Sequence, residues 1–511
     1  MKKPLFLLAA VLIAAALPAF GQGSSSAEKW ENSIVELEVT RKTYDYIQPW
    51  SKTTAKSRKI GTVIGPREIL TTATGLNDKI LIRIQKGGRG RWFNGEVKWM
   101  DYHANVALIT SDSDSFWEGL KPIELADKDF NRDGLQIARW RSGKMEARKA
   151  DFYEWRDRTL QLSTVSCLHL GANTEADGIG SAEPVFDGEK LVGICVGKGG
   201  DTASIMPYAF IRPVLKAQRE GKFAGLGIFD FTWQPTRNPD TLEYLGLKGE
   251  PRGVVVIKVP EKKDRKSVMK VRDLILEVDG HSIDNEGEYK DPEYGHLTLE
   301  NLTTHKGRSA GDKVKIKVLR DGKELEVTYT MPAADYGRDL IPDYIFDQEP
   351  EYLMTAGIVF QPLTEDFLRR WGSSWTRSAP FRLLYFRSKE STEKTPSLVV
   401  LTVVIPDPIN LGYEAIRFQV VDNVNDKQIH TLKDLTEAMK TPKDGFHVVE
   451  FIKGSAAQRL VLDAAETDNA TQRVLGRYGI PKDHYFAGEP TGAGLMENPL
   501  RQRGPRRPKG N

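Results

Sequence analysis

The chain has 511 residues, too many for one hydrophobic core, so about three domains are expected. Its 40% hydrophobic and 28% charged residues are typical of a soluble protein and do not indicate a membrane domain. The formal net charge is +3, of which Lys2 and Lys3 supply two, so the rest of the chain is close to neutral and no nucleic-acid partner is expected.

The N-terminus has the pattern of a secretory signal. Lys2 and Lys3 precede an apolar stretch from Pro4 to Ala16, and Ala19-Phe20-Gly21 supplies small residues for cleavage. The stretch is short for a membrane span, and Gly/Ser-rich sequence follows it. We therefore expect a signal peptide over 1–21, export to the periplasm or cell envelope, and no integral membrane span after cleavage. An uncleaved anchor is the alternative.

Short strands separated by Gly and Asp turns dominate residues 29–216. Many short apolar or alternating runs with few helical stretches predict an all-β barrel unit. A short helix over Ala209–Glu220 should close it. The expected strands are Ser33–Val39, Ile60–Ile64, Ile80–Ile84, Asn105–Ile109, Leu160–Val165 and Leu191–Val196.

A serine loop precedes the last of these strands: Gly178-Ile179-Gly180-Ser181-Ala182-Glu183-Pro184-Val185. It resembles the G-N-S-G-G-P-V nucleophile loop of the trypsin-like Deg/HtrA proteases. Ile69 to Leu76 resembles the family's I-L-T-N-A-H-V-V segment, and Asp101 to Ile109 resembles D-x-x-x-D-L-A-L-L. The resemblance implies a trypsin-like double β-barrel that assembles as a homotrimer or higher oligomer, either with itself alone or mixed with an active paralogue.

The two positions that should activate Ser181 hold other residues. The histidine position is Thr74, and the aspartate position is Asn105. A threonine hydroxyl has no basic state near neutral pH, and loss of the base alone costs on the order of a million-fold in turnover, roughly 8 kcal/mol. Asn105 would matter only if a histidine were there to orient.

The oxyanion hole is expected to be altered too. In this fold it uses the N–H groups of the serine and of the residue two before it, where the family has glycine and this chain has Ile179. A β-branched residue resists the backbone angles that glycine allows. Ala182 and Glu183 replace the two glycines after the serine, and Glu183 puts a carboxylate where negative charge would develop.

Two histidines of the same unit, His103 and His169, are the candidates for a substitute base. The alternative function is therefore an active, ATP-independent serine endopeptidase that uses Ser181 with a non-standard base. Cys167 and Cys195 lie on expected strands that flank the loop, so a disulfide and two buried thiols both remain open. No cluster has metal-ligand spacing and no phosphate loop occurs, so neither a metal nor a cofactor is expected.

Residues 217–332 resemble a PDZ domain of the Deg/HtrA kind. They include a helical stretch over Leu297–His305 and a hairpin that turns at Asp321-Gly322. The resemblance implies that the backbone N–H groups of the loop Leu226-Gly227-Ile228 capture the carboxylate of a peptide C-terminus. A plain turn with apolar flanks is the alternative. The further expected strands are Gly253–Val259 and Asp273–Val278.

A third unit follows a Pro/Asp-rich linker and resembles the divergent second PDZ unit of plant-type Deg proteins. Its loop residues Gly357, Ile358 and Val359 could bind a peptide, or the unit could serve assembly instead. The expected elements are strands Leu398–Ile405, Phe418–Asp426, Val448–Ile452 and Arg459–Leu462, and a helix Leu432–Met439.

Together these patterns predict a mainly β fold: a trypsin-like double β-barrel followed by two PDZ-like α+β domains. The predicted function is an exported pseudoprotease that binds peptide C-termini or unfolded segments as a chaperone, adaptor or regulator. The expected divisions are signal peptide 1–21, linker 22–28, protease-like unit 29–216, PDZ unit 217–332, linker 333–350, PDZ-like unit 351–486 and a disordered basic Pro/Gly-rich tail 487–511.

Overall fold

The computed structural model describes residues 27–127, 130–260, 267–455 and 457–488. The expected signal peptide, nearly all of the linker after it and the expected tail beyond residue 488 lie outside the described residues.

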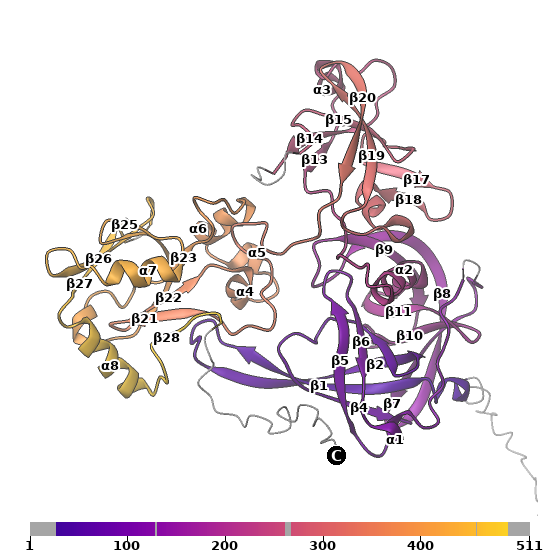
Figure 1. Cartoon of the computed structure of the whole chain (residues 1–511), viewed down its shortest axis with the longest axis horizontal. Coiled ribbons are helices and arrows are strands. Elements are labelled where there is room, and N and C mark those ends of the chain that lie inside the picture. Colours follow the sequence, from indigo (N-terminus) through magenta and orange to yellow (C-terminus); the bar gives the residue numbers. More distant parts are fainter. Residues whose placement is uncertain (1–26, 128–129, 261–266, 456, 489–511) are drawn as a thin grey trace, which may run out of the picture.

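The first unit consists of two closed antiparallel barrels of six strands each (Figure 1). Closure pairs every strand on both sides and puts alternate apolar side chains into each barrel. The first barrel runs β1-β2-β3-β6-β5-β4, with β1 (Ile34–Tyr44), β2 (Lys52–Gly65), β3 (Glu68–Thr71), β4 (Lys79–Lys86), β5 (Phe93–Asp101) and β6 (Val106–Thr110). The second runs β10-β11-β12-β9-β8-β7, with β7 (Leu135–Arg141), β8 (Lys144–Thr159), β9 (Ser166–Thr174), β10 (Pro184–Asp187), β11 (Lys190–Gly199) and β12 (Thr202–Pro207).

A shared apolar core joins the two barrels. Trp30 lies between them and stacks on Phe186 of β10, with ring centroids 4.5 Å apart. The Trp140 indole N–H of β7 donates to the Ile34 carbonyl of β1 at 2.7 Å. Short elements η1 (Glu28–Trp30) and α1 (Asp114–Trp117) flank the barrels, and α2 (Tyr208–Arg219) closes the unit. The helix expected over Ala209–Glu220 is thus confirmed within one residue at each end.

Five of the six strands expected in this unit occur, and the sixth does not. Leu160–Val165 is a turn between β8 and β9, in which the Ser163 N–H donates to the Leu160 carbonyl and the Ser163 hydroxyl accepts from the Val165 N–H. A serine that bonds its own backbone competes with sheet pairing, so the strand begins only at Ser166.

The second unit is a small α+β domain above the barrels in Figure 1. Its main sheet has the order β13-β14-β15-β19-β20, with β16 paired to β15. The strands are β13 (Thr232–Pro235), β14 (Val254–Lys258), β15 (Leu274–Val278), β16 (His281–Ser282), β17 (Glu288–Asp291), β18 (Gly295–Thr298), β19 (Lys313–Arg320) and β20 (Lys323–Thr330), and the helix is α3 (Pro239–Tyr244).

The helix expected over Leu297–His305 is instead two 3-10 turns, η2 (Leu299–Thr303) and η3 (His305–Gly307). The Thr303 hydroxyl bonds back to the Glu300 carbonyl at 2.8 Å, and Lys306 takes a left-handed φ of 54°. Both features interrupt a regular α-helix, since the threonine competes for backbone acceptors and the left-handed residue ends the turn.

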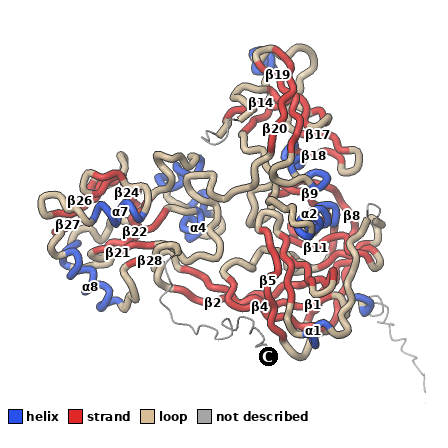
Figure 2. The backbone as a smooth tube through the Cα atoms, viewed as in Figure 1, coloured by secondary structure: helices blue, strands red, loops and turns tan. Residues whose placement is uncertain are grey.

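The third unit has an eight-stranded sheet with the main order β27-β26-β24-β23-β22-β21-β28, and β25 pairs with β24. Figure 2 shows its helices lying against the sheet or beside it. The strands are β21 (Tyr352–Thr355), β22 (Ile358–Pro362), β23 (Val399–Val404), β24 (Gln419–Val424), β25 (Lys427–Gln428), β26 (Phe446–Phe451), β27 (Arg459–Asp463) and β28 (His484–Tyr485). Its longer helices are α7 (Leu432–Met439) and α8 (Thr467–Tyr478). The unit also contains the 3-10 turn η6 (Pro408–Asn410) and a helical insertion between β22 and β23.

We call residues 365–388 the helical insertion. It comprises α4 (Glu365–Leu368), η4 (Arg369–Trp371), α5 (Trp375–Ser378), α6 (Phe381–Leu384) and η5 (Tyr385–Ser388). Neither the insertion nor α8 was expected from the sequence. The mainly β fold class is confirmed, with the double barrel first and two α+β units after it. Within the described residues, no helix is both long and apolar enough to span a bilayer.

Candidate functional site

Ser181 lies on the loop between β9 and β10, where the two barrels meet. The Ile60 N–H of β2 donates to the Ser181 carbonyl at 2.8 Å, and the Ala182 N–H donates to the Cys195 carbonyl of β11 at 3.1 Å. Ala182 has a φ of 70°, in the left-handed region that favours glycine. The loop therefore keeps a conformation suited to glycine at a position that now holds alanine.

The two upstream positions lie next to each other but form no catalytic pair. Thr74 follows β3 and Asn105 precedes β6, and the Thr74 N–H and hydroxyl both donate to the Asn105 amide oxygen, at 2.8 and 2.9 Å. These are neutral groups, and neither can accept a proton from a serine near neutral pH. No hydrogen bond joins either of them to Ser181 in the described structure.

The Glu183 carboxylate occupies the backbone donors of the serine loop. Glu183 is 2% exposed, and its Oε2 accepts from the N–H groups of Gly180 and Ser181, at 2.8 Å each. The Ser181 N–H is one of the two donors that an oxyanion hole would need. A substrate oxyanion would have to displace a buried carboxylate of the same charge. Ile179, at the other donor position, is buried in the core of the second barrel.

Lys59 is the member of this site that the sequence did not reveal. It is 5% exposed on β2, and its ammonium group donates to the Thr72 hydroxyl at 2.5 Å and to the Thr74 carbonyl at 2.7 Å. Burial lowers the pKa of Lys59 to about 8, and attraction to Glu183 opposes that shift. The available signal was a lysine directly before the apolar run Ile60–Ile64.

Lys59 does not replace the missing histidine. Its ammonium protons are directed to the oxygens of Thr72 and Thr74, and no hydrogen bond joins it to Ser181 in the described structure. Two short bonds and a nearby carboxylate favour the charged form, which has no lone pair with which to accept a proton.

The two histidines considered as substitute bases are engaged elsewhere. His169 is fully buried on β9, where its Nδ1 lies 2.9 Å from the Ser204 hydroxyl, and burial lowers its pKa to about 3. His103 stacks on Tyr336 with ring centroids 3.8 Å apart, and burial lowers its pKa to about 4. Neither is hydrogen-bonded to Ser181 among the described contacts.

The two cysteines are free thiols. Both Cys167 and Cys195 are buried, and burial raises the pKa of each. Of the two alternatives left open by the sequence, the structure has the buried thiols. In the described residues, no group of three or more His, Cys, Asp or Glu side chains is placed to hold a metal ion.

The linker between the second and third units lies on the loops that carry Thr74 and Asn105. Tyr336 stacks on His103, and Phe346 stacks on Tyr102 with ring centroids 3.9 Å apart. The Asp347 carboxylate accepts from the Asp78 N–H at 2.7 Å and from the Tyr102 hydroxyl at 3.1 Å. Further on, Glu349 pairs with Lys42 and Lys52 of the long β1-β2 hairpin, at 2.8 and 3.0 Å.

The predicted peptide loop of the second unit is partly paired with its own chain. Leu226 is buried in the core shared by the barrels, Gly227 pairs with Ala333, and the Ile228 N–H donates to the Pro332 carbonyl at 3.0 Å. A peptide carboxylate at this loop would have to displace residues 332–334. The outer edge of β13, a few residues on, is not paired in the described sheet.

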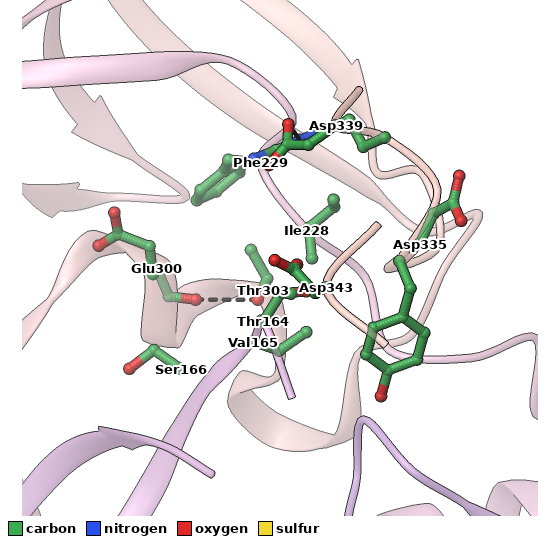
Figure 3. Close-up of a pocket in the computed structure, with 12 residues that line it drawn as sticks. Thr164, Val165, Ser166, Ile228, Phe229, Glu300, Thr303, Asp335, Asp339 and Asp343 are labelled. Carbon is green, nitrogen blue, oxygen red and sulfur yellow. Dashed lines mark hydrogen bonds and ion pairs between the residues drawn. The ribbon is translucent and has the colours of Figure 1, made fainter. Parts of the chain in front are cut away.

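A small cavity lies beside this loop, as Figure 3 shows. Its volume is about 90 Å³, and Ile228 and Phe229 form its wall on one side, with Glu300 and Thr303 of η2 on another. Thr164, Val165, Ser166, Asp335, Tyr336, Arg338, Asp339 and Asp343 complete the lining. The space is small for a peptide side chain, and four of its five charged lining residues are acidic.

The predicted peptide loop of the third unit is a hairpin turn. Ala356 and Gly357 have φ values of 50° and 81°, as in the two-residue turns that join antiparallel strands. Ile358 and Val359 lie on β22, which is paired with β21 on one side and β23 on the other. A peptide strand added at these residues would have to displace β21.

Comparison with known proteins relates the chain to one group of proteases. A PDZ domain family matches residues 341–485, beginning ten residues before the boundary expected at 351. Protease Do-like 4, mitochondrial, of Arabidopsis thaliana is 24% identical over 471 residues, covering 91% of this chain and 86% of the relative. Protease Do-like 2, chloroplastic, of the same plant is 24% identical over 470 residues, covering 88% and 74%.

Among solved structures, the HtrA-type protease AlgW with a decapeptide is 16% identical, with a TM-score of 0.46, over 61% of this chain and 98% of that chain. At this TM-score the likeness adds nothing to the fold described above. The homologues of this chain are thus Deg/HtrA-like proteases of the plant Do-like group, and its third unit carries a PDZ domain.

Proposed function

We propose that the chain is a Do-like protein without protease activity, which binds peptide C-termini or unfolded segments as a chaperone, adaptor or regulator. The observation that carries the proposal is the state of the serine loop. The Ser181 N–H is bonded to the buried Glu183 carboxylate, and the base position holds Thr74, itself bonded to Asn105. A serine that has no base, and whose own N–H is not free to bind an oxyanion, lacks groups that contribute strongly to acyl transfer.

Peptide binding is supported by the PDZ match and by a free sheet edge. β13 is the outermost strand of the second unit's sheet, so an extended segment could pair with it as an added strand. The loops Leu226-Gly227-Ile228 and Gly357-Ile358-Val359 remain predicted contacts, because binding there requires displacement of chain segments that now pair with them.

Export to the periplasm or cell envelope and trimer-based assembly belong to the same proposal. Export is supported by the sequence pattern of residues 1–21, and assembly, whether with itself or with an active paralogue, is supported by the resemblance to the Deg/HtrA family. The homologues named above carry mitochondrial and chloroplastic labels, so they belong to organelles rather than to a periplasm.

Cleavage of unfolded casein tests the catalytic half. Purified protein should leave casein intact over hours, as should the Ser181→Ala variant. Cleavage by the wild type that disappears in Ser181→Ala would establish the alternative, an active endopeptidase with a non-standard base.

Fluorescence anisotropy with labelled peptides tests the binding half. A peptide with a free apolar C-terminus should bind, and Ile228→Asp should weaken it, since Ile228 is partly exposed beside β13. Tyr244→Ser, at a 71% exposed position on α3 of the same unit, is the matched control and should bind as the wild type does. Gly227→Trp is unsuitable, because even a Cβ there would lie 3.1 Å from Met331.

A further inference from the structure

The helical insertion has an unusual composition that the proposed function does not use. After its first two residues, Glu365 and Asp366, the chain from Phe367 to Lys389 contains six Arg or Lys, six aromatic residues and no Asp or Glu. The cations are Arg369, Arg370, Arg377, Arg382, Arg387 and Lys389, and the aromatic residues are Phe367, Trp371, Trp375, Phe381, Tyr385 and Phe386.

Two aromatic side chains of the insertion are exposed to solvent. Phe381 and Tyr385, one helical turn apart on α6 and η5, are 79% and 52% exposed. Side chains at positions i and i+4 of a helix lie on the same face. On the inner side of the insertion, Leu383 of α6 and Phe367 of α4 pack in a small core with Val400 of β23. The insertion is therefore anchored to the sheet, while Phe381 and Tyr385 stay uncovered.

Several of the cations lack an acidic partner. Arg369 and Arg387 are paired with Glu365, but Arg370, Arg377 and Lys389 have no carboxylate within ion-pair distance in the described chain. Lys389 instead lies over the Tyr385 ring at 5.0 Å, and Arg370 lies over the Trp371 ring at 4.4 Å. Arg417, from outside the insertion, lies over the Phe418 ring at 5.8 Å, and Arg370 lies over the same ring at 4.9 Å.

From this arrangement we infer that the helical insertion is a docking surface for an anionic lipid bilayer. Exposed Phe and Tyr side chains on one helical face partition into the interface between headgroups and acyl chains. Lys389 beside Tyr385, and the unpaired Arg370 and Arg377 of the same insertion, are attracted to anionic headgroups over a Debye length. Tryptophan and tyrosine prefer the same depth. Figure 1 shows α4, α5 and α6 gathered at one end of the third unit, outside its sheet.

Vesicle flotation with the full-length mature chain tests the inference. The protein should float with vesicles of phosphatidylcholine mixed with phosphatidylglycerol, and not with phosphatidylcholine alone. Phe381→Ser combined with Tyr385→Ser should reduce binding about tenfold, Arg377→Glu should reduce it severalfold, and high salt should weaken it in the wild type. Leu411→Ser, which alters a 79% exposed residue elsewhere on the third unit, is the matched control and should bind normally.

Two further measurements separate this surface from other sources of binding. A chain ending at residue 488 lacks the basic residues after it and should still float; binding that disappears with that segment would overturn the inference. Wild-type vesicle binding that is unchanged in Phe381→Ser and Arg377→Glu would also overturn it. The same holds if the wild type does not bind vesicles and the variants instead lose binding to single-stranded nucleic acid, or lose self-association on size exclusion. Circular dichroism of each variant should match the wild type, since Phe381, Tyr385 and Arg377 are all exposed.

Discussion

Replacing Glu183 by alanine is expected to lower the free energy of unfolding by about 3–5 kcal/mol. The carboxylate is 2% exposed and accepts two backbone hydrogen bonds of 2.8 Å. Hydrogen bonds to an ionised group contribute about 1.5–3 kcal/mol each, and the two N–H groups would be left without acceptors in a buried site. The change also removes the attraction that stabilises the buried ammonium group of Lys59.

Two further experiments separate the contribution of the Glu183 charge to stability from that of its hydrogen bonds. Glu183→Gln retains an acceptor oxygen and should cost only about 1–2 kcal/mol. A double-mutant cycle with Lys59→Met should give a coupling of about 1–2 kcal/mol, because Lys59 and Glu183 attract each other. If the two single effects simply add, the buried charges do not interact and the description of the site is wrong.

Titration of Lys59 should also make the stability of the protein depend on pH. Its folded pKa of about 8 lies below the value of about 10.5 expected in the unfolded chain, so the folded state gives up this proton first. Stability should therefore rise between about pH 8 and pH 10.5, by up to about 3 kcal/mol, and this rise should be missing in Lys59→Met.

Urea unfolding at neutral and alkaline pH, followed by circular dichroism, measures these effects. Glu189→Ala, at an exposed carboxylate on the next hairpin, is the matched control and should change stability by no more than about 0.5 kcal/mol. A loss below about 1 kcal/mol for Glu183→Ala would refute the reasoning, because a buried, doubly bonded carboxylate cannot be removed so cheaply.

Three further predictions follow from the same geometry. The double variant Thr74→His/Asn105→Asp should still fail to cleave casein, because Glu183 keeps the oxyanion donor; cleavage would mean that the carboxylate moves aside readily. Ala182→Gly should raise stability by about 0.5–1 kcal/mol in thermal unfolding, since its φ of 70° strains an alanine, and a loss of stability would contradict that strain. Burial raises the pKa of Asp157 to about 6, above its unfolded value, so the folded state holds this proton more tightly and stability falls as pH rises from about 4 to 6. Asp157→Asn should remove this fall, which is up to about 3 kcal/mol, and an unchanged pH profile would count against it.

The barrels were predictable because their strands are apolar runs between Gly and Asp turns. β1, β2, β4, β6 and β11 each contain apolar residues that alternate or run continuously, and this pattern is visible without knowing which strands pair. The same reasoning failed at Leu160–Val165, where apolar residues at both ends conceal a serine that bonds its own backbone. It also missed the helical insertion, whose segments of three or four residues are too short to show a helical period.

The serine site was predictable in its residue types but not in its bonding. Thr74, Asn105 and Glu183 could be identified from their positions around Ser181, because the surrounding motifs fix the alignment. That Glu183 bonds the Ser181 N–H depends on how the loop turns, which no local pattern determines. Lys59 was missed because its burial results from β2 closing into a barrel beside a loop far away in sequence.

At the two predicted peptide loops, the sequence pattern indicated the wrong structure. Each contains the apolar-glycine-apolar pattern that predicts an open carboxylate-binding loop, yet both are paired with other parts of the chain. Gly357 serves a tight hairpin, for which a positive φ is also needed. The same glycine pattern therefore suits both a binding loop and a turn, and only the pairing of the neighbouring strand distinguishes them.

The central claim is that Ser181 is not a reactive nucleophile. Its most direct test is intact-protein mass spectrometry after incubation of the purified chain with an excess of diisopropyl fluorophosphate at neutral pH. The account predicts an unchanged mass, because no base among the described residues is hydrogen-bonded to the Ser181 hydroxyl and Glu183 occupies the Ser181 N–H. A single phosphoryl adduct that maps to Ser181, and that is absent from Ser181→Ala, would contradict it.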